Sequence, residues 1–321
     1  MLLRSLLVGA ARSTFAAALG LGLAAAVAVQ PVPAFARTVA AASATAFRPP
    51  AQGGGPALWV VRDADSTVYL YGTVHVLRPS TVWRWSGVEA AFDSASEIWF
   101  EISNPDDTAA ITPLIQQHGL SPDRPLNSLL SPTEYADLTA AAGIAGVPVA
   151  QLNVFRPWLA GLTLSVAPLT RAGYDPQSGV ELTLKARAEA AGKTIHGFET
   201  IDKQVALLAD MPEADQLDFL RGTLAAFDDA TTDLDRLVDR WSHGDVAAVR
   251  RLGVDDLRRQ GPGVYQTLLV RRNADWAGQI QHLLEGSGTV FIAVGAAHLA
   301  GPDSVQAQLE RRGVHVAVAV R

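Results

Sequence analysis

The segments of this chain with strand character lie mainly near its two ends, and a long stretch with helical periodicity separates them. Near the amino end, residues 57–61 and 67–71 are rich in β-branched and aromatic residues and enclose a polar turn, which predicts a β-hairpin. Residues 97–102 predict another strand. Near the carboxyl end, residues 289–294 form a continuous apolar run, as expected for a central strand that is covered on both faces. Strands so far apart pair only if the chain between them leaves the sheet and returns.

The middle of the chain, from about residue 109 to 284, is predicted to be mainly helical because apolar residues recur there at spacings of three and four. The expected helices cover residues 133–142, 154–169, 180–191, 202–208, 214–226, 234–241, 246–257 and 265–284. A short strand is expected over 194–197, a further helix over 304–312 and a last strand over 314–320. We therefore predict an α/β fold in which helices flank a mixed central β-sheet, with a large, mainly helical middle insertion. It forms one domain over residues 57–321.

The first 36 residues have the layout of a secretory signal peptide. Arg4 and Arg12 give a basic start, an apolar run follows, and Ala34-Phe35-Ala36 is a small-x-small cleavage site. We predict cleavage after Ala36, a flexible linker over residues 37–56, and a periplasmic or secreted mature protein that meets the membrane only through the signal peptide before cleavage. The alternative is an uncleaved anchor, because the apolar run is about long enough to span a bilayer.

The composition and the absence of several known motifs exclude some classes of catalytic site and of binding partner. The chain has no cysteine, which excludes a thiol nucleophile, thiolate metal ligands and a lipidated cysteine. Its formal net charge is −6 at pH 7, so nucleic acid is not an expected partner. The sequence contains no Gly-x-Ser-x-Gly motif, no His-Glu-x-x-His motif and no phosphate-binding glycine-rich loop.

A Gly-x-x-His motif occurs twice, each time directly after a predicted strand. Gly72-Thr73-Val74-His75 follows one strand, Gly295-Ala296-Ala297-His298 follows another, and Glu101 lies near the end of a third. Because sites in α/β sheets lie beyond the carboxyl ends of the strands, these side chains are expected to meet. Two imidazoles and a carboxylate suit a divalent metal such as zinc, manganese or cobalt, which lowers the pKa of a bound water. The alternative is that the histidines cap turns, and the residues alone leave both open.

The order of short motifs along residues 57–321 resembles the TraB/PrgY/GumN family, which is related to the Tiki metalloproteases of animals. The matching segments are Leu58-Trp59, Tyr69 to His75, Phe100-Glu101, Arg156-Pro157-Trp158, Gly173-Tyr174-Asp175-Pro176, Gly179-Val180-Glu181, Gly197-Phe198-Glu199-Thr200, Arg272-Asn273 with Trp276, Val294 to Leu299, and Gly301. The family's position for Glu181 is often Asp, a change that keeps the carboxylate.

The resemblance implies a metal-dependent hydrolytic centre. Carried over, it makes His75 and His298 metal ligands, and Glu101 either a third ligand or the general base that orients water. Glu199 is the other candidate for either carboxylate role. Its alternative role is a helix-start acid beside the macrodipole.

The same resemblance places Arg272 and Asn273 at the site. Arg272 is expected to stabilise negative charge on a tetrahedral intermediate or to clamp a substrate carboxylate, and Asn273 to donate a hydrogen bond there. The alternative for Arg272 is an ion pair on a helix surface. Trp83-Arg84-Trp85, close after His75, is a candidate wall of a substrate groove. Structural roles are expected for the other histidines: His118, His196, His243, His282 and His315.

Two functions of different classes follow. The first is an exported hydrolase that depends on a divalent metal ion (manganese, cobalt or zinc) and acts on a peptide or protein substrate. The alternative is a non-catalytic periplasmic binding or accessory protein whose cleft captures a peptide, haem or a metal, since paired histidines also serve as axial ligands of haem.

Overall fold

The computed structural model describes residues 55–319, without the side chain of Gln260. The predicted signal peptide and almost all of the predicted linker lie outside the described residues, as does Val320, the last residue of the predicted final strand. No helix in the described range is long and apolar enough to cross a membrane.

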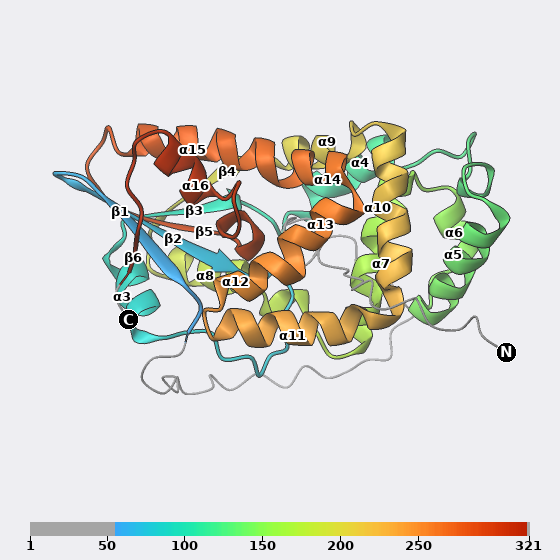
Figure 1. Cartoon of the computed structure of the whole chain (residues 1–321), viewed down its shortest axis with the longest axis horizontal. Coiled ribbons are helices and arrows are strands. Elements are labelled where there is room, and N and C mark those ends of the chain that lie inside the picture. Colours follow the sequence, from blue (N-terminus) through green and yellow to red (C-terminus); the bar gives the residue numbers. More distant parts are fainter. Residues whose placement is uncertain (1–54, 320–321) are drawn as a thin grey trace, which may run out of the picture.

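A mixed six-stranded sheet forms the centre of the molecule (Figure 1). Its strands are β1 (Leu58–Arg62), β2 (Ser66–Thr73), β3 (Glu97–Ile102), β4 (Thr194–Glu199), β5 (Gly288–Gly295) and β6 (Ala317–Val318). The order across the sheet is β4-β3-β5-β2-β1-β6. The four strands from β4 to β2 are parallel, β1 and β2 form the predicted antiparallel hairpin, and β6 pairs antiparallel with β1. The predicted fold class is confirmed.

Side chains of the central strand β5 alternate between two hydrophobic layers. Val290, Ile292 and Val294 pack against α15 (Arg271–Leu283) and α16 (Val305–Arg311), while Phe291 and Ala293 face the opposite layer. That layer contains residues of α3 (Ser86–Ser94), α8 (Val180–Ala190) and α11 (Ala230–Ser242). Because successive side chains of a strand point to opposite faces, one apolar run fills both layers.

Two long helical excursions leave the sheet and return to it. Between β3 and β4 lie α4 (Thr108–His118), α5 (Pro132–Ala145), α6 (Val149–Asn153), α7 (Pro157–Arg171) and α8; between β4 and β5 lie α9 (Ile201–Ala209), α10 (Glu213–Ala226), α11, α12 (Val246–Val249), α13 (Asp255–Gln260), α14 (Pro262–Tyr265) and α15. Helices α5, α6, α7 and α10 form the right-hand part of Figure 1, apart from the sheet, and share their own hydrophobic cluster.

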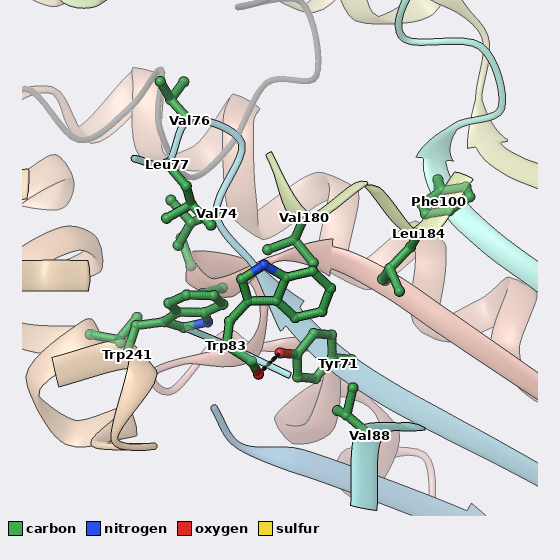
Figure 2. Close-up of a cluster of buried hydrophobic side chains, with 14 of the residues drawn as sticks. Tyr71, Val74, Val76, Leu77, Trp83, Val88, Phe100, Val180, Leu184 and Trp241 are labelled. Atoms are coloured by element: carbon green, nitrogen blue, oxygen red, sulfur yellow. Dashed lines mark hydrogen bonds between the residues drawn. The ribbon is translucent and has the colours of Figure 1, made fainter. Parts of the chain in front are cut away.

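Three local predictions differ from the structure. Two expected helices contain π-helical turns, Arg250–Val254 and Gln266–Val270. The final strand is shorter than predicted, because only Ala317–Val318 pair with β1 and the backbone N–H of Val316 donates to Glu310 instead. The prediction that Trp83 and Trp85 line a substrate groove is wrong, because both side chains belong to the core, with 6% and 9% of their surface exposed. Figure 2 shows Trp83 among buried side chains, where its carbonyl accepts a hydrogen bond from the Tyr71 hydroxyl.

Candidate functional site

The two Gly-x-x-His turns lie side by side at the carboxyl edge of the sheet. Strands β2 and β5 are parallel neighbours, with Thr73 opposite Gly295. A Cβ at Gly72 would lie 3.2 Å from the Cα and 3.3 Å from the Cβ of Ala296, so the neighbouring turn would have to shift by a few tenths of an ångström. A glycine at position 72 therefore lets the second turn pack directly on the first.

The chain after Gly72 is held against the start of α8. The backbone N–H of Val180 donates to the Val74 carbonyl over 3.2 Å, and Val74, Val76 and Val180 belong to the same buried hydrophobic cluster (Figure 2). A Cβ at Gly179 would collide with the carbonyl oxygen of His75, so this approach requires glycine. The close contact brings Glu181, two residues further along, next to the His75 ring.

His75 is held by its Nδ1 atom, which donates to Oε1 of Glu181 over 2.8 Å. The Thr73 hydroxyl donates to the same oxygen. The Nε2 atom of His75 is buried, has no hydrogen-bond partner within the described residues, and lies 3.7 Å from Oε1 of Glu101. Burial opposes protonation, but the charge of Glu181, with help from Glu101, outweighs it and raises the pKa of His75 above its ordinary value.

His298 lies in a 3-10 turn, Ala296–Leu299, and is completely buried. The amide nitrogen of Asn273 donates to the carbonyl of Asp303, so Oδ1 of Asn273 faces Nδ1 of His298 at 2.6 Å. This assigns the ring proton to Nδ1 and the lone pair to Nε2. Nε2 lies 3.2 Å from Nη1 of Arg272 and 3.7 Å from Oε1 of Glu101. Burial, followed by the charges of Arg272 and His75, lowers the pKa of His298 well below its ordinary value, so the ring is neutral.

Arg272 joins the two glutamates behind the histidines. Its Nη2 donates to Glu101 over 2.6 Å and to Glu199 over 2.8 Å, and its Nε donates to Glu199 over 2.9 Å. Nη1 also donates to the carbonyl of Leu268 over 3.2 Å, in the π-helical turn that precedes α15. Only 2% of the Arg272 surface is exposed.

Further N–H groups, besides those of Arg272, donate to both glutamates of this cluster. Glu101 accepts from the backbone N–H of Gly295 over 2.9 Å, and Glu199 accepts from the Trp276 indole over 3.2 Å. Gln204 donates to both carboxylates over 3.3 Å. Both carboxylates therefore act as acceptors in these hydrogen bonds.

A pocket reaches this cluster from one side. Its lining residues are His75, Phe100, Glu101, Ile102, Pro105, Pro176, Glu181 and Leu182. Arg272, Asn273 and His298 do not line it, so they lie behind the atoms that a ligand would meet. A molecule in the pocket therefore contacts His75 and Glu101 first, between apolar walls.

The donor set suits a divalent cation, although it is not closed around one. The Nε2 atoms of both histidines lie 3.7 Å from one oxygen of Glu101, and carboxylate or amide partners on both Nδ1 atoms orient the rings. Within residues 55–319, no three His, Asp or Glu side chains already stand at metal-site spacing. The Nη1 atom of Arg272 is also directed at Nε2 of His298. A cation would need a small inward movement of the three ligands and release of that contact.

The model of the TraB/PrgY/gumN family matches residues 57–318. This chain belongs to the TraB/PrgY/gumN family. It is also similar to an uncharacterized protein of Treponema pallidum (strain Nichols), with 25% identity over 260 residues, which cover 77% of this chain and 78% of that protein. No solved structure matches the chain significantly.

The structure brings together all six side chains that the sequence singled out in this family member. His75, Glu101 and His298 share one cluster, and Arg272 connects it to Glu199. Arg272 is not on a helix surface, and its contacts are those of a residue that holds the two glutamates. Asn273 was expected to donate a hydrogen bond to the reacting group, but its amide nitrogen donates to the Asp303 carbonyl and its amide oxygen faces His298.

The other histidines lie elsewhere. His196 stacks on Trp99 with ring centroids 4.7 Å apart and pairs with Glu97. His282 and His315 form exposed pairs with nearby glutamates, and His243 pairs with Asp239 in the same way.

The predicted set of site residues omitted Glu181, Thr73 and Gln204. Glu181 matched a family segment, but nothing in the sequence alone showed that it holds His75. Thr73 lies inside the first Gly-x-x-His motif, where it could have been noticed as a hydroxyl at the strand end. Gln204 carries no such signal, because one glutamine in an amphipathic helix is ordinary.

Proposed function

We propose that this protein is an exported, metal-dependent hydrolase that acts on peptide bonds. The observation that supports it most is the buried Nε2 of His75, which has no hydrogen-bond partner among residues 55–319 and faces the Glu101 oxygen that His298 also approaches. A buried ring nitrogen without a partner is costly unless a ligand satisfies it. The amino-terminal signal layout supports a periplasmic or secreted location as part of the same proposal.

His75, His298 and Glu101 would hold the cation, with manganese, cobalt or zinc as the candidate ions. A cation bound there would act as a Lewis acid and would lower the pKa of a water that it carries. To bind through Nε2, His75 gives up the proton that its carboxylate neighbours favour. Nη1 of Arg272 releases His298 and keeps the Leu268 carbonyl as its acceptor.

Residues around the cation would then have separate roles in the reaction. Glu101 and Glu181 both line the pocket, and Glu181 is engaged by His75 and Thr73, so Glu101 is the carboxylate placed to accept a proton from an attacking water. Glu181 keeps the His75 ring oriented, and Arg272 keeps Glu101 in place by a direct hydrogen bond while it also binds Glu199. Phe100, Ile102 and Leu182 provide apolar walls that exclude bulk water from a bound peptide.

A binding protein without turnover is the second candidate, and one observation favours it. Arg272 already satisfies Glu101, Glu199 and His298 without a metal. Such a protein would bind a peptide or a metal ion in the pocket but would leave a peptide intact. Haem suits the structure less, because His298 is 0% exposed and packs on Trp276 with ring centroids 4.4 Å apart.

The test is a peptide-library hydrolysis assay on the purified protein with manganese, cobalt or zinc added separately. Glu101→Gln is compared with Glu97→Gln, a change on the same strand that touches only the peripheral His196 and Trp99. The proposal predicts metal-stimulated cleavage that Glu101→Gln reduces at least a hundredfold and Glu97→Gln leaves within about twofold. Binding of peptides without cleavage under every metal would support the second candidate, and equal activity of the two variants would reject the assigned site.

A further inference from the structure

A second cavity lies in the helical part of the molecule, between α7 and α10. It has a volume of about 210 Å³ and is lined by Ser121, Arg124, Leu129, Arg156, Pro157, Glu213 and Gln216. None of these residues lines the pocket at His75. Arg156-Pro157-Trp158 matched a family segment in the sequence, yet the proposed hydrolytic centre does not use it.

The side-chain oxygen of Gln216 is a buried acceptor at this cavity. The side chain is 1% exposed, and its amide nitrogen donates to the carbonyls of Ala209 and Met211. These two bonds fix the orientation of the carboxamide, because a flipped group would set its oxygen against both carbonyls. The oxygen Oε1 therefore remains for the cavity, and no donor within the described residues reaches it. A ligand that satisfies Oε1 must carry an N–H or O–H group.

Arg156 places positive charge on the same wall. Its guanidinium donates to the carbonyls of His118 and Ala209, and no carboxylate pairs with it among the described residues. Ala209 accepts from both Arg156 and Gln216, so the guanidinium and the carboxamide are neighbours. At the mouth, Arg124 forms a bidentate pair with Glu213. The two arginines and one glutamate leave a net positive wall.

The helix ends add to this charge. Helices α7 and α10, of 15 and 14 residues, both begin at the cavity, and neither has a side-chain cap at its first turn. The amino-terminal end of a helix carries partial positive charge and favours a negative group. The cavity thus offers a positive wall for an anion together with one buried acceptor for a donor.

We propose that this cavity binds a small molecule or chain end that carries an α-carboxylate with a nitrogen donor on the adjacent carbon. The carboxylate pairs with Arg156, and the nitrogen donates to Oε1 of Gln216. A free amino acid and the carboxyl end of a short peptide share this chemistry. A phosphate fits less well, because the Gln216 oxygen and the Glu213 carboxylate are both acceptors. This site does not depend on the proposed hydrolytic activity.

The test is isothermal titration calorimetry of the purified full chain with L-alanine and with L-alanyl-L-alanine. Saturable binding at one site by either probe is expected, and the tighter of the two identifies the source of the carboxylate. L-Alaninamide lacks the carboxylate, acetate lacks the nitrogen, and inorganic phosphate is an anion without a nitrogen donor. Each of these three should bind at least tenfold more weakly, because each loses at least one of the two anchoring contacts.

Two variants locate the binding. Ser121→Phe places a bulky side chain in the cavity that Ser121 lines, and should weaken binding at least tenfold. Arg124→Gln lies at the exposed mouth, where folding is not at risk, and should weaken binding about threefold or more through lost charge. Arg236→Gln, an exposed change on α11, is the matched control and should bind as the unmodified chain does. No saturable binding by either probe, equal binding of acetate or phosphate, or unchanged binding by Ser121→Phe would overturn the proposal.

Discussion

At the scale of single residues, the cluster is organised around one buried guanidinium. Arg272 provides three of its nitrogens to Glu101, Glu199 and the Leu268 carbonyl, and its planar fork matches two carboxylates better than an ammonium group does. Buried ion pairs of this kind add little net stability by themselves, but removal of one partner leaves the others uncompensated. The structure therefore makes Arg272 a residue that holds catalytic candidates in place.

Arg272→Met should strongly destabilise the fold, because it leaves two buried carboxylates without their cation. We expect a loss of about 3–5 kcal/mol in the free energy of unfolding, measured by urea denaturation. Arg236→Met, at a side chain with 65% of its surface exposed, should change that free energy by less than about 0.5 kcal/mol. A loss below about 1 kcal/mol for Arg272→Met would show that the buried network is not held as described.

A second residue-scale prediction concerns acid stability. The backbone N–H of Ser131, then the Arg221 side chain and the Ser131 hydroxyl, lower the pKa of Glu134 from 4.5 to about 2. Because the folded-state pKa is lowered, the stabilisation is fully present above about pH 4.5 and is lost as the pH falls toward 2.

Glu134→Gln should therefore flatten the pH dependence of the unfolding free energy between about pH 4.5 and 2. The effect will be smaller than the pKa shift alone implies, since the side chain is partly exposed and solvent screens it. Urea titrations at several pH values measure it. An identical slope in the variant and the unmodified chain would contradict the assignment.

At the scale of elements, the site depends on how closely the two Gly-x-x-His turns pack and on what connects to them. Gly72 at the end of β2 touches Ala296 in the turn that carries His298. Helix α9 links the site to the second cavity, because Gln204 donates to Glu101 and Glu199 while Ala209, at its last turn, accepts from Arg156 and Gln216.

A pair of glycine substitutions tests the packing of the two turns. Gly72→Ala should cost about 1–3 kcal/mol of unfolding free energy, because the new methyl group has to push Ala296 and its turn away. Gly143→Ala lies in α5 with nothing within 4 Å and should stabilise the protein by up to about 1 kcal/mol through helix propensity. Denaturant unfolding of both variants is the measurement. A neutral Gly72→Ala would mean that the turns are not in close contact.

At the scale of the whole molecule, periodicity and motif order predicted most of the architecture. The hairpin, β3, the apolar β5 and the predicted helices of the middle region are present with bounds close to the predicted ones, because each has a local pattern of burial, whereas α4 and α6 were not predicted. The convergence of His75, Glu101 and His298 was predictable because parallel strands share one carboxyl edge.

Other features of the fold and the site could not be predicted, because they depend on contacts between residues that are far apart in the sequence. The order of strands in the sheet is set by packing between segments far apart in the chain. The burial of Arg272, on α15, depends on the π-helical turn before it and on two glutamates from strands β3 and β4. The pairing of His75 with Glu181 depends on Gly179 meeting the His75 carbonyl, which the sequence shows only as one more glycine.

We propose that His75, Glu101 and His298 form one metal-binding site. It is tested most directly by the metal content of the purified protein, measured by mass spectrometry, beside His75→Ala/His298→Ala and the control His282→Ala/His315→Ala, whose changed side chains are more than 80% exposed. We expect about one manganese, cobalt or zinc ion per chain in the unmodified protein and the control, and none in the first variant. No bound metal after these ions are added back, or equal metal in both variants, would contradict the account.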